Sequence, residues 1–210
     1  VADFVVLEDL TNFNVLETYI DGICVASGGT THIESVPFEI LNNFNTSKKN
    51  VLDFQVKATK SKIRVIEALD GELVTNELIL DNLIKDENLV SNVEKDILKM
   101  TVVNRYNDDS PAMAFIKNFG LKEGAIASSV GHDSHNIIAV GVSDEAICKA
   151  VNLLIENKGG ICAVSETSAK VVSLPVAGIM SAKTGWEIGE EYAKLDKLAK
   201  EMGSTLRAPY

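Results

Sequence analysis

The sequence has few cysteines and no long hydrophobic run. No apolar stretch approaches the roughly 18 residues that a membrane-spanning helix needs, and no basic region of a secretory signal peptide is visible. The three cysteines are odd in number, far apart and without a C-x-x-C pair. We therefore expect no membrane segment, no disulfide framework and no zinc site built from cysteines, and a cytoplasmic location.

Motifs for phosphate binding and serine hydrolysis are also missing. Neither G-x-G-x-x-G nor G-x-x-x-x-G-K-[ST] occurs, and there is no G-x-S-x-G elbow. The 20 basic and 30 acidic residues give a net charge of −10 at pH 7. Nucleic-acid binding needs clustered basic residues that displace counterions from phosphates, so we expect no nucleic-acid partner.

What is present is the composition of a folded protein. Of the 210 residues, 46% are hydrophobic and 24% are charged. This length suits one large domain, or one domain of ordinary size with a small additional piece. The chain begins at Val1 rather than Met, so we expect a fragment or a processed product.

Residues 1–29 predict three short strands, at 4–7, 15–20 and 23–26. Asp21-Gly22 is a strong hairpin signal between the second and the third. A meander of this size cannot bury enough surface to be stable alone, so it should belong to a larger sheet. The polar, asparagine-rich residues 30–50 predict a linker.

Residues 51–210 predict a mixed β-sheet domain of the α/β or α+β class, with about three helices. Helices are expected from Ser110-Pro111 to Gly120, from Ser143 to Gly159, and from the capping box at Thr184 to Gly203. Buried positions on the last helix would be Trp186, Tyr192, Leu195, Leu198 and Met202. The expected strands cover 62–69, 72–80, 97–103, 124–130, 137–142, 161–164 and 170–174.

The most chemically versatile segment is Gly131-His132-Asp133-Ser134-His135-Asn136, between two β-branched runs. Three interpretations remain open for it. It is a solvent-exposed hairpin tip, a loop that faces a substrate, or a metal site. A metal site needs a sharp turn at Asp133-Ser134, because residues three apart in a strand point to opposite faces.

Arg105 follows an apolar strand and is a second candidate. It can clamp an anion or stack on a ring, and the alternative is an ordinary pair with a surface acid. The cysteines Cys24, Cys148 and Cys162 each lie in an apolar run, where a small buried hydrophobe is expected.

A family resemblance adds to this interpretation. The run from Ala114 to Asn136, AFIKNFGLKEGAIASSVGHDSHN, resembles the C-terminal region of adenine deaminases of the amidohydrolase superfamily. Residues 102–106, 137–141 and 174–181 also fit this region. Residues 2–22 look like closing strands of the small β-sandwich that accompanies amidohydrolase barrels.

The resemblance implies three segments: 1–29 as sandwich strands, 30–50 as a linker, and 51–210 as the C-terminal domain, cut short near its end. It also implies an activity for the longer enzyme, in which divalent Mn or Fe activates water to convert adenine to hypoxanthine and ammonia in purine salvage. Adenine would be the small-molecule partner, and a homo-oligomer is expected.

This sequence departs from the family in lacking the metal-binding barrel. It has three histidines and no His-x-His pair, so it cannot supply the family's metal ligands. We therefore expect the fragment to bind no metal, to hold no catalytic residue and to be inactive alone. The substrate-proximal candidates are His132, Asp133, Ser134, His135, Asn136 and Arg105. The alternative is a non-catalytic ligand-binding or dimerisation module.

Overall fold

A computed structural model describes residues 1–36 and 39–210. The chain divides into a smaller unit, Val1–Glu39, and a larger unit, Ile40–Tyr210. The boundary lies inside the segment that was predicted as a linker. Each unit is described separately below.

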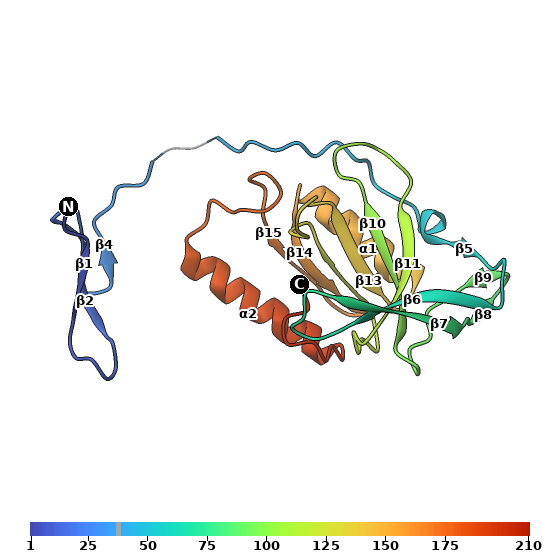
Figure 1. Ribbon diagram of the computed structural model, residues 1–210. Helices are drawn as coiled ribbons and strands as arrows, with labels where there is room; N and C mark the ends of the chain where they lie inside the picture. The colour runs from blue at the N-terminus through green and yellow to red at the C-terminus, as the bar shows by residue number, and fades with distance from the viewer. Residues whose placement is uncertain (37–38) are drawn as a thin grey trace. The chain divides into compact units, whose positions relative to one another are not determined.

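The smaller unit is one antiparallel sheet with the strand order β1-β2-β3-β4 (Figure 1). Asp21 and Gly22 turn the β2–β3 hairpin with positive φ values of 51° and 77°, as a type I′ turn requires. The three predicted strands are confirmed, and a short fourth strand was missed. No described residue of this unit is buried. The strands are β1 (Phe4–Leu7), β2 (Val15–Ile20), β3 (Ile23–Ser27) and β4 (Thr30–Thr31).

The larger unit is built on an eight-stranded mixed sheet, which confirms the predicted fold class. Its order is β15-β14-β12-β13-β10-β11-β6-β7, and all neighbours are antiparallel except β11 and β6. The strands are β6 (Lys62–Ala68), β7 (Thr75–Asp81), β10 (Ile97–Val103), β11 (Ala112–Lys117), β12 (Ala125–Ser128), β13 (Ile137–Gly141), β14 (Gly160–Val164) and β15 (Ala169–Ser173). A separate three-stranded sheet contains β5 (Val56–Lys57), β8 (Ile84–Lys85) and β9 (Asn88–Leu89).

Helix α1 (Asp144–Glu156) covers one face of the main sheet. Ser143 caps it by accepting a hydrogen bond from the Ala146 amide, and its first turn is acidic, as the helix dipole favours. Its buried stripe packs on alternate residues of the central strands, among them Ala127 and Ala139. This packing forms one of the three apolar clusters of the described residues.

Helix α2 (Gly185–Glu201) packs against β14 and β15 on the opposite face (Figure 1). The predicted capping box is present: Thr184 accepts from the Glu187 amide, and the Glu187 carboxylate accepts from the Thr184 amide. Leu195, Leu198 and Met202 are buried as expected. Over residues 1–36 and 39–210, no helix has the length and apolar character needed to cross a bilayer.

Three expectations for the larger unit are wrong. The helix expected after Ser110-Pro111 is instead strand β11, because hydrogen bonds to β10 on one side and β6 on the other hold that segment extended. The described residues therefore contain two α-helices and one 3₁₀ turn, η1 (Val51–Phe54). Trp186 is 87% exposed and Tyr192 is 37% exposed, because the buried residues of α2 begin only at Leu195.

The end of the predicted linker is part of the larger unit. Phe44, Thr46 and Lys49 are buried, and the Lys49 backbone is held by the side chain of Asn152 on α1. Lys49 Nζ also lies 2.5 Å from Asp108 Oδ1. These contacts tie the segment before η1 to the fold of the larger unit.

Candidate functional site

The histidine loop (residues 131–136) joins the end of β12 to the start of β13, as predicted. The His135 amide donates to the Gly131 carbonyl at 2.8 Å, which closes a tight turn. This turn brings the rings of His132 and His135 to a centroid distance of 5.8 Å, tilted by 51°. The loop is therefore compact, and the two imidazoles lie near one another.

Most of the polar groups of the histidine loop face solvent. His132 Nε2 pairs with Asp133 Oδ1, and these side chains are 85% and 84% exposed. Ser134 is also exposed, whereas His135 and Asn136 are half-buried. His135 Nδ1 is buried and has no hydrogen-bond partner among the described residues. The loop thus offers one accessible His–Asp pair and one partly enclosed imidazole.

The described residues contain no metal-binding cluster. Over 1–36 and 39–210, no group of three or more His, Cys, Asp or Glu side chains is placed to hold a metal ion. The histidine loop brings two imidazoles and one carboxylate into one turn, but they do not form such a group. The residues present therefore do not fit the Mn or Fe centre that the family resemblance implies.

Arg105 lies next to the histidine loop but is not on the surface. Its side chain is 5% exposed, and it takes part in none of the ion pairs of the described residues. The expected pair with a surface acid is therefore wrong. Its guanidinium carbon lies 4.7 Å from the ring centroid of Tyr106 and 5.8 Å from that of Phe44, so the stacking alternative describes it better.

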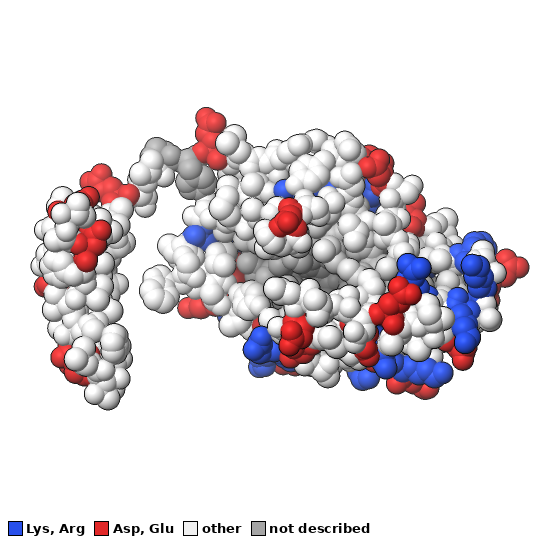
Figure 2. Space-filling model, in the orientation of Figure 1, with Lys and Arg blue, Asp and Glu red and all other residues white. Residues whose placement is uncertain are grey.

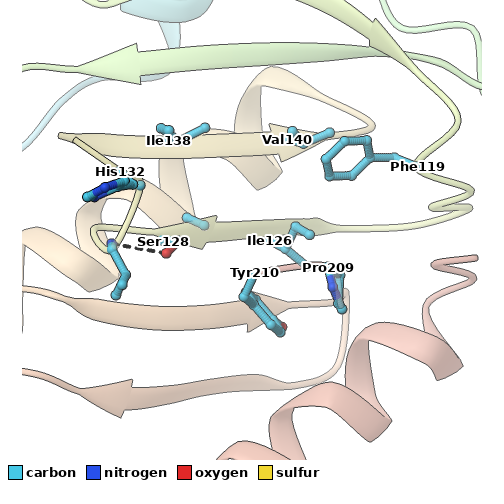
Figure 3. A pocket seen from close by; sticks show the side chains of 11 residues that line it. Phe119, Ile126, Ser128, His132, Ile138, Val140, Pro209 and Tyr210 are labelled. Atoms are coloured by element: carbon cyan, nitrogen blue, oxygen red, sulfur yellow. Dashed lines mark hydrogen bonds between the residues drawn. The ribbon is translucent and has the colours of Figure 1, made fainter. Parts of the chain in front are cut away.

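An apolar pocket of about 360 Å³ begins at the histidine loop and follows the α2 face of the sheet (Figure 3). Ile126, Ile138 and Val140 contribute from β12 and β13, and Phe119 and Tyr210 also line it. Burial raises the pKa of the Tyr210 hydroxyl. A pocket of this size and composition suits a small, largely apolar molecule.

Polar groups of this pocket lie mainly at the loop end. Ser128 accepts a hydrogen bond from the Val130 amide at 3.1 Å, and His132 lines the same end (Figure 3). The face of the larger unit seen in Figure 2 is hollowed near its middle, and uncharged atoms predominate around the hollow. The pocket can therefore combine apolar contact with polar recognition at one end.

Other buried ionisable groups lie away from the loop. Lys99 is 1% exposed, and its ammonium lies 2.5 Å from Asp144 at the start of α1. This pair is at the opposite end of β13 from the histidine loop, because Lys99 faces Gly141 and Val103 faces Ile137. Cys148 and Cys162 are buried as expected, whereas Cys24 is half-buried. Burial raises the pKa of the Cys162 thiol to about 12, so it is not a nucleophile at neutral pH.

Sequence reasoning missed several residues that shape this end of the sheet. Asn42, Tyr106, Ser129 and Gly178 come from four separate segments and meet around Arg105 and the loop. Ser129 is the most enclosed of them, at 0% exposure, with its hydroxyl donating to the Gly178 carbonyl at 2.6 Å. No local pattern signals these contacts, since all except the one between the neighbours Arg105 and Tyr106 join residues far apart in the chain.

Comparison with known proteins gives a consistent result. The family model "Adenine deaminase C-terminal domain" matches residues 72–210. Proteins named adenine deaminase match the whole chain, or 99% of it, with 52% identity in Sulfurovum sp. (strain NBC37-1), 46% in Methanosarcina acetivorans and 41% in Borreliella afzelii. The chain spans only 38–40% of the length of these relatives.

Proposed function

The chain belongs to the adenine deaminase family and corresponds to the C-terminal portion of its members. We propose that it works as part of an adenine deaminase. The complete enzyme would hydrolyse adenine to hypoxanthine and ammonia, in the cytoplasm, as a step of purine salvage. The relatives' name and the match over the whole chain support this proposal.

The catalytic centre of that enzyme would lie outside these 210 residues. In support, the described residues hold no cluster of metal ligands, and the relatives are about two and a half times as long as this chain. The Mn or Fe ion would therefore be bound elsewhere in the longer protein, and the chain by itself would be inactive.

The histidine loop would cover the active site and contact the purine. The observation that carries this role is the exposed His132–Asp133 pair, held on a closed turn beside an apolar pocket. An imidazole and a carboxylate on a hydrogen-bonded turn suit recognition of a polar heteroaromatic edge, and the loop, by covering the active site, would exclude water from the reaction.

Kinetics of the longer enzyme test this role. We expect Asp133→Ala and His135→Ala each to lower kcat/KM for adenine about tenfold, the size of one lost polar contact. His32→Ala is the matched control, because His32 is the histidine of the smaller unit and is exposed. Wild-type kcat/KM in both loop variants would show that the loop does not contact the substrate.

A second assay tests the missing centre. The 210-residue chain with added Mn²⁺ should release no ammonia from adenine, whereas the full-length protein should. Activity in the chain alone would place the catalytic centre within these residues and return His132 and His135 to consideration as metal ligands.

The apolar pocket favours a second candidate, a non-catalytic ligand-binding module. In that case the isolated chain should bind a small heteroaromatic molecule. Titration with adenine or hypoxanthine, followed by NMR shifts at Ile126, Ile138 and Val140, measures this directly. Saturable NMR chemical-shift changes in this chain would favour the ligand-binding module. Light scattering in the same buffer would test the expected homo-oligomer.

A further inference from the structure

The guanidinium of Arg105 is a buried cation, and its hydrogen-bond acceptors among the described residues are all neutral. Nη1 donates to the Ala177 carbonyl at 2.6 Å and to Asn42 Oδ1 at 3.4 Å, and Nη2 donates to the Tyr106 hydroxyl at 2.9 Å. Nε is buried and has no partner among the described residues. Burial of a charge without a carboxylate is unfavourable. The burial of this arginine is best explained by the segments of the chain that its planar set of donors connects.

The side chain joins two segments that are remote in sequence. Ala177 belongs to the proline turn (residues 175–180), which follows β15. Tyr106 receives a hydrogen bond from Nη2 and donates its own hydroxyl hydrogen to the Ser134 carbonyl at 3.0 Å. The guanidinium is therefore connected to the histidine loop through one intervening hydroxyl.

The backbone of Arg105 adds two further links. Its amide donates to Asn136 Oδ1 at 3.3 Å, in the histidine loop. Its carbonyl accepts from the amides of Asn45 and Thr46, at 2.7 and 3.2 Å, in the strap (residues 40–46). One residue thus contacts the strap, the proline turn and the histidine loop together.

Gly178 leaves the space that the guanidinium occupies. A Cβ atom at this position would lie 2.0 Å from Arg105 Nη1, too close for any side chain without displacing the arginine. Gly178 also has a φ of +73°, and its carbonyl is held by the buried Ser129 hydroxyl. The close approach of the turn to Arg105 therefore requires glycine at residue 178.

We infer that Arg105 is a positioning residue: its guanidinium and backbone fix the histidine loop against the proline turn and the strap, and it does not contact substrate. This inference deepens the proposed function, and its functional consequence rests on that proposal. Its structural consequence can be measured in the 210-residue chain alone.

Hydrogen exchange tests the structural part. In the intact chain, Arg105→Met should speed amide exchange across residues 131–136 about tenfold, because the loop then opens locally. Arg105→Lys should do the same while the global melting temperature stays closer to wild type, since an ammonium lacks the planar fork that directs separate donors to Ala177 and Tyr106. Arg64→Met is the matched control, because Arg64 is 75% exposed on β6.

Unchanged exchange at 131–136 in Arg105→Met would overturn the inference. A loss of protection spread evenly over the whole larger unit would also overturn it, because that result describes general destabilisation. In either case the histidine loop would be held by its own turn.

Gly178→Ala provides an independent perturbation that keeps the arginine. It should speed exchange at 131–136 about tenfold in the wild-type background and less than about twofold in the Arg105→Met background, because the clash partner is then absent. Gly29→Ala controls for backbone strain alone, since Gly29 has a φ of +79° with open space around it. Additive effects of the two substitutions would show that Gly178 does not act through the guanidinium.

Full-length enzyme tests the functional part. Arg105→Met should lower kcat/KM for adenine about tenfold. Adding Asp133→Ala should lower it by less than about a further twofold, because both substitutions act through the same correctly positioned histidine loop. A hundredfold loss in the double variant would assign Arg105 a separate role and overturn the inference. If exchange responds as expected but Asp133→Ala keeps wild-type kinetics, the positioning role stands and the proposed function of the loop fails.

Discussion

In the smaller unit none of the described side chains is buried, whereas the larger unit buries three clusters of apolar side chains. Both units form well-paired antiparallel strands. Strand pairing alone contributes little to the net free energy of folding, because the backbone N–H and C=O groups form hydrogen bonds to water in the unfolded chain. Burial of apolar surface contributes about 25 cal/mol per Å², and only the larger unit has fully buried apolar side chains among the described residues.

Charge separates the two units as clearly as burial does. Figure 2 shows the smaller unit without any blue Lys or Arg atoms, and all 20 basic residues of the sequence lie in Ile40–Tyr210. Repulsion among like charges adds to the shortage of buried surface. The acidic residues of the smaller unit are Asp3, Glu8, Asp9, Glu17, Asp21, Glu34 and Glu39. This unit has the hydrogen bonds of a sheet without the means to stay folded alone.

Expression of the two units separately should produce the largest effect. Residues 1–39 should give a collapsed amide NMR spectrum typical of an unfolded chain, because a few strands without a core are marginal at best. Residues 40–210 should unfold cooperatively, with a melting temperature within about 3 °C of the whole chain. A dispersed spectrum from residues 1–39 would show that backbone pairing suffices there, and the comparison would fail.

A matched pair of core and surface truncations sharpens the comparison. Leu154 in α1 is 0% exposed, so Leu154→Ala should lower the free energy of unfolding by about 2–5 kcal/mol. Ile23 in β3 is 67% exposed, so Ile23→Ala should change it by less than about 0.5 kcal/mol. Urea denaturation followed by circular dichroism measures both. Equal losses would mean that Ile23 is covered in solution.

Acid titration should give the smallest effect. The Lys49 ammonium, with help from Ser47, holds the pKa of Asp108 well below its usual range, and the Asn12 amide is the main cause that lowers the pKa of Asp9. A depressed folded-state pKa stabilises the fold above the unfolded pKa of about 3.9, and this stabilisation is lost as the pH falls through the folded value. Both carboxyls should therefore titrate at a lower pH than an ordinary aspartate.

The two titrations should differ in reach. The Asp108 carboxylate accepts hydrogen bonds from residues about 60 positions away in the sequence. Its protonation should therefore shift the amide NMR signals of Ser47 and Lys49. The Asp9 carboxylate accepts hydrogen bonds from amides two and three positions away. The shifts caused by its protonation should therefore stay within its own turn. Carboxyl and amide NMR between pH 6 and pH 2 measures this, with Asp108→Asn as control. A normal pKa for Asp108 would show that the Lys49 contact does not persist in solution.

Local signals in the sequence were sufficient for much of the fold. The strand over residues 15–20, the Asp21-Gly22 turn and the capping box at Thr184 each depend on neighbours within a few positions, and all three predictions are confirmed. The prediction of a helix over residues 112–117 was wrong. It relied on the local helix-start signal Ser110-Pro111, whereas pairing with β10 and β6 makes this segment a strand. Where tertiary pairing competes with a start signal, pairing prevails.

The candidate site shows the same limit. The position of the histidine loop between two strands is confirmed, because it needs only the local pattern of β12 and β13. The pocket and the surroundings of Arg105 could not be predicted, since they join distant residues such as Asn42 and Pro175. The roles of the loop side chains remain predictions.

Trp186 is the only tryptophan of the chain, and its side chain lies in water in the folded protein. Its fluorescence emission should already resemble that of free indole, so unfolding of the core will change the spectrum little. Intrinsic fluorescence is therefore a poor reporter of denaturation for this chain. The same indole becomes a sensitive reporter of docking, because any protein surface that covers the start of α2 will shift its emission to the blue.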